Sequence, residues 1–569
     1  MSRVVNGWGS PASTTRTSNC AARSIACVPD GVVTSCSLLV TGSSRRRRAV
    51  VRGTGAAGEV PYRGTVVPLN ERKIGLRSGS RGSRGSSRSE GVAVFLNQMP
   101  RYEILSADAM ATLDRGWRRI VSEIGVEFMS PRALELFRKA GMKVEENNVL
   151  FDPEFLLEQV AKAPREFDVQ ARNPANTVHI GGDHMAFGAV YGSPFVREGD
   201  VRRDATLDDF HRFCKLSQVF GEMDSAGGVV CEPGDAPLDS RHLDMVYALQ
   251  TLTDKIYMGN VVSGPNAADT IAMTRILLGD IETVPATISL INCNSPLRWD
   301  DRMLDAQFEY SAANQPVVLT PFLLMGAMSP VSVPATLVQQ IAEALTGIAL
   351  SQLIRPGCPV IFGSFLSNID MQSGSPCFGT PESAVGLLCT GQIARRFGLP
   401  WRSGGALTSS QTADAQAGYE ALMTMLPTFL AGANWVMHTA GWLEGGLVSG
   451  FEKFVMDVEI LRMLQHEFTP LEITEESLAF DAHAEVGHGG HFLGAAHTME
   501  RFRTCFYRPL LSSSDNYERW MRRGAKDAAA RATEIYRAKL QEYEPPPLDD
   551  AIREELRDYV TRRRRELGD

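Results

Sequence analysis

Aromatic residues recur beside the short apolar runs in the central part of this sequence. Carboxylates occur at similar places, at Glu232, Asp370 and Glu444. The aromatic residues that fall within a few positions of the end of a run are Tyr191, Phe195, Phe322, Phe365, Trp401, Tyr419 and Trp442. Aromatic faces combined with one or two carboxylates attract a quaternary or tertiary ammonium ion. For each aromatic taken singly, packing between a strand and a helix is the simpler alternative.

The same positions are poor in acid and base chemistry. They contain no obvious acid–base pair, no lysine for a Schiff base and no glycine-rich phosphate loop with a basic residue. The pair Gly404-Gly405 is compatible with an ordinary tight turn after a strand.

Four histidines lie within fifteen residues, in and around the glycine-rich run 486–496: His483, His488, His491 and His497. They raise the alternative of a zinc site. Their spacing matches no established metal motif, and a glycine-rich loop does not fix ligands as a helix does. We expect no bound metal, and we keep His491 as a candidate for a loop over the pocket.

These side chains need a framework of strands and helices. The runs that read as strands are 186–191, 225–230, 255–262, 287–291, 317–323, 359–362, 401–404 and 435–439. Amphipathic segments between them read as helices, at 239–252, 267–278, 301–313, 336–353, 383–397, 417–430 and 451–464. The strand runs are apolar throughout, as expected for strands covered on both faces. The alternation predicts a (β/α)8 TIM barrel with its site at the carboxyl ends of the strands.

Four regions follow from these patterns. Residues 1–98 are rich in Arg, Ser and Gly, and we expect a disordered basic tail. A basic arm and a transit peptide are alternatives, but we favour a start codon assigned too early, because Met99 directly precedes the first patterned segment. Residues 99–180 read as a helical and hairpin layer with helices at 106–124, 131–141 and 153–163, and residues 181–510 as the barrel. Residues 511–569 read as a charged helical extension.

Charge and composition exclude several classes of protein. The tail holds fifteen Lys and Arg against four Asp and Glu, a net charge of +11. The whole chain carries −8, so the remainder carries −19. An acidic body argues against nucleic-acid binding. The ten cysteines form no Cys-x-x-Cys pair and suggest buried thiols of a cytoplasmic protein. No uninterrupted apolar run reaches the roughly 18 residues of a membrane span.

Several motifs resemble the trimethylamine methyltransferase family. The run 404–410 (GGALTSS) and its continuation 414–420 (DAQAGYE) resemble the segment around the family's active-site residue. Further similarity lies, in chain order, in 338–347, in Phe362-Gly363-Ser364 with Asp370, in 431–434, and in 489–493 (GGHFL). The resemblance extends over about residues 101–544 and implies the same barrel.

The resemblance places Leu407 where the founding members carry pyrrolysine. Leucine has no electrophilic imine and cannot form the adduct proposed for that residue. The chain is thus similar to the branch without pyrrolysine, which demethylates glycine betaine and related quaternary amines. The resemblance further implies a corrinoid supplied in trans by a partner protein; the chain has no Asp-x-His-x-x-Gly motif of its own. We also expect a homo-oligomer.

The expected pocket is formed by Gly404, Gly405, Thr408, Asp370, Tyr419, His438, His491 and Glu232, around Leu407. Arg298, Arg402, His438 or His491 could pair with a substrate carboxylate. A quaternary ammonium is already an activated methyl donor, because the amine leaves as a neutral molecule. Two alternatives stay open: a non-catalytic quaternary-amine binder or sensor, and a zinc-dependent enzyme that uses the cluster from His483 to His497.

Overall fold

The computed structural model describes residues 94–568. Its centre is a curled sheet in which seven strands run parallel, in the spatial order β7, β18, β17, β14, β13, β11, β10. Their bounds are β7 (His184–Phe187), β10 (Tyr257–Met258), β11 (Thr287–Cys293), β13 (Val317–Met325), β14 (Val360–Gly363), β17 (Trp401–Gly404) and β18 (Trp435–Met437). Nearly every residue in them is buried, as the apolar runs predict.

The expected strand at 225–230 is reduced to one paired residue. Ser225 makes single parallel bridges to Gly188 on one side and Ile256 on the other, between β7 and β10. Gly227 follows with a φ of +82°, which an extended strand does not tolerate. The prediction of a full strand here is wrong because the backbone turns at this glycine.

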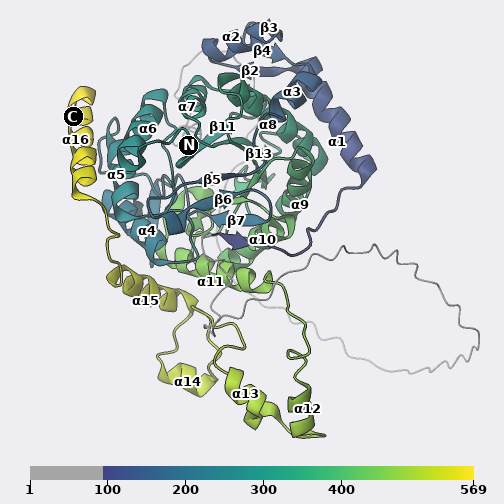
Figure 1. Cartoon of the computed structure of the whole chain (residues 1–569), viewed down its shortest axis with the longest axis vertical. Helices are drawn as coiled ribbons and strands as arrows, with labels where there is room; N and C mark the ends of the chain where they lie inside the picture. The colour runs from purple at the N-terminus through teal and green to yellow at the C-terminus, as the bar shows by residue number, and fades with distance from the viewer. Residues whose placement is uncertain (1–93, 569) are drawn as a thin grey trace, which may run out of the picture. The chain divides into compact units, whose positions relative to one another are not determined.

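Helices follow the strands. They are α4 (Leu207–Val219), α5 (Arg241–Leu252), α6 (Gly264–Leu278), α7 (Asp301–Ala312), α8 (Val333–Ile354), α9 (Pro381–Arg396), α10 (Ala415–Ala431) and α11 (Phe451–Glu467). Figure 1 shows them in chain order around the outside of the curled sheet. Capping side chains begin six of them, because each accepts a backbone N–H of the first turn; they are Thr206, Ser263, Asp300, Ser332, Thr380 and Asp414. This confirms the expected α/β alternation, with α4 as an element that the sequence pattern did not single out.

Helix α8 is the one helix in residues 94–568 whose length and composition would allow it to cross a membrane. Most of its apolar window is buried, 83% of it, inside the protein. It packs against β13, α9 and the N-terminal helices. Its apolar character is therefore that of a core helix enclosed on all sides.

An N-terminal layer covers α8. It contains α1 (Ala107–Arg119), a π-helical turn η1 (Ile120–Ile124), α2 (Pro131–Lys139) and α3 (Pro153–Val160). A small sheet in the order β12, β2, β4, β3 joins it, with β2 (Val126–Phe128), β3 (Lys143–Glu145), β4 (Asn148–Leu150) and β12 (Arg298–Trp299). Ser106 caps α1 by accepting from the Ala109 N–H, as expected, whereas Ser130 precedes α2 without a side-chain cap bond. The hairpin β5 (Phe167–Val169) and β6 (Val178–Ile180), with the 3₁₀ turn η2 (Pro174–Asn176) between its strands, leads into β7.

The folded region begins before Met99. Strand β1 (Phe95–Leu96) pairs antiparallel with β7, and Val94, Phe95 and Asn97 are buried. The Asn97 amide donates to the Phe429 carbonyl at 2.8 Å. Residues 94–98, which the sequence pattern assigned to the tail, thus belong to the fold; the prediction for residues 1–93 lies outside the described residues.

Short strands extend beyond the sheet at the carboxyl ends of its strands. They are β8 (Phe195–Glu198), β9 (Val201–Asp204), β15 (Phe365–Ile369), β16 (Pro376–Cys377), β19 (Trp442–Leu443) and β20 (Val448–Gly450), with the 3₁₀ turn η3 (Glu444–Gly446). Strand β20 pairs parallel with β8, and β15 pairs parallel with the outer part of β13. They carry several of the residues that line the site below.

The C-terminal part contains α12 (Phe480–Val486), η4 (Phe492–Gly494), α13 (Ala496–Arg501), α14 (Tyr517–Arg522), α15 (Ala528–Gln541) and α16 (Asp550–Leu567). Helix α15 packs against α11 and α4, and α16 packs against α5 and α6. The Tyr559 hydroxyl and the Arg563 guanidinium both donate to Asp269 of α6 at 2.8 Å. Helices α15 and α16 therefore pack against the outer helices, and α16 also forms side-chain hydrogen bonds to α6.

Candidate active site

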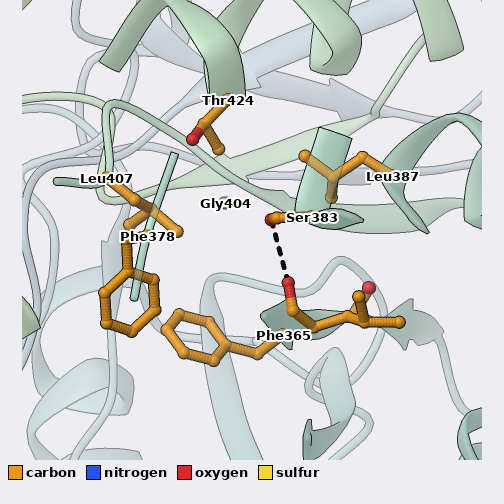
Figure 2. A pocket seen from close by; sticks show the side chains of 9 residues that line it. Phe365, Phe378, Ser383, Leu387, Gly404, Leu407 and Thr424 are labelled. Carbon is orange, nitrogen blue, oxygen red and sulfur yellow. Dashed lines mark hydrogen bonds between the residues drawn. The ribbon is translucent and has the colours of Figure 1, made fainter. Parts of the chain in front are cut away.

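A pocket opens at the carboxyl ends of β14 and β17, among the loops that follow them. It is lined by Ser364, Phe365, Leu366, Phe378, Ser383, Leu387, Gly404, Leu407 and Thr424. Figure 2 shows Leu407 beside Phe378, with Phe365 next to it and Thr424 and Leu387 at the opposite end. The Ser383 hydroxyl closes one side by donating to the Leu366 carbonyl at 3.0 Å. A pocket thus lies just past the strand ends, where the sequence predicts the site.

The backbone of the Leu407 loop requires its two glycines. A Cβ on Gly405 would lie 2.5 Å from the His438 carbonyl oxygen and from the Thr439 Cα, which are backbone atoms that cannot move aside. A Cβ on Gly404 would meet the Leu407 side chain at 2.7 Å. The pair Gly404-Gly405 therefore lets two neighbouring loops approach closely and leaves space for Leu407.

Three aromatic rings form a cage around Leu407. The ring centroids of Phe365 and Phe378 lie 5.6 Å apart, those of Phe378 and Trp442 lie 5.5 Å apart, and those of Phe365 and Trp442 lie 6.0 Å apart. All three residues belong to one buried apolar cluster with Leu407, Val190 and Leu324. Rings at such distances pack against one another. Together they form an apolar wall with negatively polarised ring faces, which suits an ammonium ion with methyl groups.

Arg402 lies under this cage. Its side chain is almost fully buried, Nη1 donates to the Ser364 carbonyl at 2.7 Å, and the guanidinium carbon lies 5.3 Å from the centre of the Phe365 ring. No acidic side chain of residues 94–568 forms an ion pair with it, and its Nε has no hydrogen-bond partner there. Burial lowers the pKa of Arg402 to about 9, so the group remains charged at neutral pH.

His438 completes the polar part of the site. It is fully buried, its φ is +60°, and its ring centroid lies 4.5 Å from that of Trp442. Burial, together with the nearby Arg402 guanidinium, lowers the pKa of His438 well below its usual value. The imidazole is therefore neutral at physiological pH, and it retains one N–H donor.

Several buried polar atoms here have no protein partner. Both ring nitrogens of His438, the Nε of Arg402 and the indole Nε1 of Trp442 lack hydrogen bonds within residues 94–568. Buried polar groups without partners are uncommon and destabilising, so these atoms are available to bond to a ligand or to water. The combination of an unpaired buried cation, neutral donors and an aromatic cage indicates a binding site for a small molecule with an anionic end and an apolar cationic end.

Comparison with known proteins agrees with this chemistry. The family model for "Trimethylamine methyltransferase (MTTB)" matches residues 73–568. The chain belongs to the trimethylamine methyltransferase family. It is 40% identical over 475 residues to the glycine betaine methyltransferase of Desulfitobacterium hafniense (strain Y51), covering 83% of this chain and 99% of that protein. It is therefore an enzyme that transfers methyl groups.

Other similarities are more distant. The proline betaine:corrinoid methyltransferase of Eubacterium limosum is 29% identical over 399 residues, 68% of this chain and 82% of that protein. Among solved structures, the monomethylamine methyltransferase of Methanosarcina barkeri matches with a TM-score of 0.46 and 11% identity, over 79% of this chain and 90% of that one.

Two expected pocket residues of this family member, Thr408 and Glu232, form contacts near the pocket without lining it. The Thr408 hydroxyl donates to the Glu420 carboxylate on α10, which holds the end of the Leu407 loop. Glu232 pairs with Arg241 and lies near Tyr191, whose pKa is raised by burial and by that carboxylate. Neither Thr408 nor Glu232 lines the pocket of this methyltransferase.

Three expected residues lie away from the pocket. Asp370 is exposed and caps its own turn by accepting from the Ser373 hydroxyl at 2.6 Å, which lowers the pKa of its carboxyl. Tyr419 points to solvent from α10 with 59% of its surface exposed. His491 is exposed at the start of η4. The sequence located the loops of Asp370 and His491 and the helix of Tyr419, but it did not fix the direction of these side chains.

The histidine cluster does not converge. Within residues 94–568, no group of three or more His, Cys, Asp or Glu side chains is arranged to hold a metal ion. His483 instead packs its ring 5.4 Å from Phe492. The zinc alternative therefore lacks the ligand geometry that it requires.

Sequence reasoning missed part of the pocket. Phe378, Leu387 and Thr424 were not singled out, although they line the pocket with Leu407. Phe378 follows the hairpin of β15 and β16, and no periodic pattern marks that insertion. Leu387 and Thr424 lie on the inner faces of α9 and α10, where an apolar or small residue reads as ordinary helix packing.

Proposed function

We propose that this methyltransferase takes a methyl group from a quaternary amine that carries a carboxylate, such as glycine betaine, and passes it to the corrinoid of a partner protein. The observation that supports this most strongly is the buried Arg402, which is charged, has no acidic partner in residues 94–568 and lies beside the aromatic cage. The relatives named for glycine betaine and proline betaine fit the same substrate class.

The two ends of a betaine match the two parts of the site. The carboxylate accepts from Arg402, whose Nε is free, and from the neutral His438. The trimethylammonium group then lies among Phe365, Phe378 and Trp442. The substrate carboxylate also supplies the counter-charge that Arg402 lacks, which offsets the high free energy of an unpaired buried cation.

The protein's task in the reaction is binding and orientation. A quaternary ammonium leaves as a neutral tertiary amine when the N–CH3 bond breaks, so no side chain has to donate or accept a proton. The absence of ionisable pairs in the cage agrees with this. The rings exclude water and fix the direction of the N–CH3 bond. Cation–π attraction weakens as positive charge leaves nitrogen, so the rings contribute to orientation more than to acceleration.

The corrinoid, when its carrier protein docks, supplies the reduced cobalt nucleophile that accepts the methyl group. We place the docking face at the carboxyl ends of the strands, since the pocket opens there. The partner, a corrinoid protein, is an expectation that the names of relatives such as the proline betaine:corrinoid methyltransferase support.

The pocket is narrow as it stands. The free space between its side chains is enough for about one water molecule, which is less than a trimethylammonium group occupies. Leu407 and Phe378 are the side chains whose rotation would widen it, because they lie side by side at its edge. We infer that substrate binding displaces one or both of them.

We further propose that the sheet closes into a complete (β/α)8 barrel, with the segment at Ser225 as its eighth strand. The supporting observation is the pair of parallel bridges from Ser225 to Gly188 and to Ile256, which spans the space between the two ends of the seven-stranded sheet.

The free cysteines of residues 94–568, most of them buried, favour a reducing compartment, and we propose the cytoplasm. We also propose a homo-oligomer without nucleic-acid or membrane partners. The net negative charge of the chain beyond residue 98 argues against nucleic-acid binding.

One experiment tests the main proposal. The purified protein is incubated with glycine betaine, a reductant and cob(I)alamin or a cognate corrinoid protein, and methylcobalamin formation is followed by absorbance. We expect methylation that depends on both enzyme and betaine. Calorimetric binding of betaine without methyl transfer, even with the cognate corrinoid protein, would favour the non-catalytic binder instead.

A further inference from the structure

A buried ion pair lies behind the cage, on α11. Lys453 and Asp457 are one turn apart and neither side chain has any exposed surface. The Lys453 ammonium donates to Asp457 and also to the Ala406 carbonyl, at 3.0 Å. Asp457 in turn accepts from the Gly441 N–H at 2.8 Å. One pair of side chains thus bonds to the backbone of two loops, those after β17 and β18.

The two backbone groups are the neighbours of two cage residues. Ala406 directly precedes Leu407, and Gly441 directly precedes Trp442. Leu407 and Trp442 lie in the same buried cluster. A second bond joins the loops directly, since the Ala406 N–H donates to the His438 carbonyl at 2.9 Å. The ion pair therefore links the loop of Leu407, which lines the pocket, to the loop of Trp442, which packs in the same cluster.

The other side of the Leu407 loop is held by a separate contact. The Glu420 carboxylate accepts from the Ser409 N–H at 2.8 Å, and the Ser409 hydroxyl accepts from the Phe378 N–H at 2.8 Å. Leu407 is thus fixed between Lys453 on one side and Glu420 on the other. Its own side chain packs in the apolar cluster of the cage.

Packing alone does not require a charged pair at this place. Burial lowers the pKa of Lys453 and raises the pKa of Asp457 to about 7, so the protein pays a desolvation penalty for both charges. Apolar residues of similar size often replace buried ion pairs without loss of stability. What apolar side chains cannot supply are the two directed bonds to Ala406 and Gly441.

We propose that Lys453 and Asp457 are positioning residues that hold Leu407 and Trp442 at the spacing which selects and orients the quaternary ammonium group. This rests on the proposed function of the pocket. It predicts that the pair governs discrimination between small and bulky betaines more than it governs stability.

The test uses the double variant Lys453→Met/Asp457→Asn. It keeps the volume and the acceptor for Gly441, removes both buried charges, and releases the Ala406 carbonyl. Steady-state kinetics with the corrinoid partner compare glycine betaine with the bulkier proline betaine, alongside calorimetric Kd values and Tm. The control is His242→Leu, which breaks a buried contact of 2.9 Å with Asp269 between α5 and α6.

We expect the double variant to keep a Tm close to that of the unmodified protein. Its kcat for glycine betaine falls by about tenfold or more, because a small misplacement of reacting groups has large kinetic effects. Its preference for glycine betaine over proline betaine falls in both kcat/KM and Kd. The control lowers Tm and leaves that preference unchanged.

A double variant that folds and keeps both kcat and the preference within twofold overturns the inference. If the unmodified protein transfers no methyl group, the proposed function fails, while the ratio of the two Kd values still tests the positioning role by itself. If the double variant does not fold, Lys453→Arg, which keeps the charge and moves the donor, serves in the same comparison with the same outcomes.

Discussion

The guanidinium carbon of Arg402 lies 5.3 Å from the centre of the Phe365 ring, and Phe365 is also a wall of the aromatic cage. One ring thus borders both the protein's own cation and the place proposed for the substrate's cation. Two positive charges this close repel each other in a water-poor site. A carboxylate on the substrate removes that repulsion, so the geometry favours zwitterionic betaines over simple ammonium ions such as tetramethylammonium.

Arg402→Gln tests the anionic subsite. Loss of a charged hydrogen-bond partner for the carboxylate is expected to cost about 2–3 kcal/mol, a decrease of roughly 30- to 150-fold in kcat/KM for glycine betaine. Steady-state methylation of the corrinoid partner measures this. The matched control is Arg298→Gln, since Arg298 is exposed and pairs with Glu127 outside the pocket. Equal effects of the two substitutions would show that Arg402 does not recognise the carboxylate.

His438 gives a prediction about pH and stability. Burial and the Arg402 guanidinium hold the pKa of His438 well below its usual value. Below pH 6.5 the unfolded chain therefore binds a proton that the folded protein excludes, and the folded protein loses about 1.4 kcal/mol of stability per pH unit. Above pH 6.5 this contribution is constant.

The comparison is between the unmodified protein and His438→Gln, which has no titrating group at this position. Calorimetric Tm values from pH 7.5 to pH 5.5 should fall more steeply for the unmodified protein. Parallel curves would mean that His438 accepts a proton in the folded state. Because the imidazole stays neutral, its titration should also be absent from the kcat/KM profile between pH 6 and 8.

Trp442→Leu tests the aromatic cage. It keeps an apolar side chain but removes the ring face, so binding of the ammonium group should weaken by about 1–2 kcal/mol, or roughly 5- to 30-fold in Kd. Calorimetry with glycine betaine gives this value. Phe137→Leu, in the N-terminal layer, should lower Tm without changing Kd. A cage variant that binds betaine as tightly as the unmodified protein would contradict a cation–π role.

Leu407→Ala tests whether this side chain restricts the pocket. Removal of three carbons from a buried position should lower stability by about 2–5 kcal/mol and widen a pocket that is too narrow as it stands. We expect kcat/KM to fall for glycine betaine and to rise for proline betaine. Parallel decreases for both substrates would mean that Leu407 contributes only to packing.

The sequence was most informative where the pattern is long and periodic. The strand expected at 401–404 coincides with β17, and the expected helices match α5 to α11 within a few residues at each end. Both depend on local apolar periodicity. The failure at 225–230 has a local cause as well, because Gly227 turns the chain where the apolar run continues.

The sequence predicted where the site lies, but it predicted only some of the residues that form it. The aromatics Phe365 and Trp442 and the polar candidates Arg402 and His438 were named because they lie in or beside strand ends, and the structure brings all four together. Asp370 lies just past a strand end, Tyr419 lies on α10 and His491 lies in a later loop, and all three side chains are exposed. Whether a loop residue faces the pocket depends on one or two backbone dihedrals, such as the positive φ of His438, that the residue type does not reveal.

The most direct test of the account is the fate of a labelled methyl group. Glycine betaine with isotopic label in its N-methyl groups is incubated with the enzyme and a reduced corrinoid partner protein, and labelled methylcorrinoid and dimethylglycine are quantified over time. We expect the two products in equal amounts, with trimethylamine and tetramethylammonium giving little or none under the same conditions. Preferential demethylation of trimethylamine, or binding of glycine betaine without any methylcorrinoid, would contradict it.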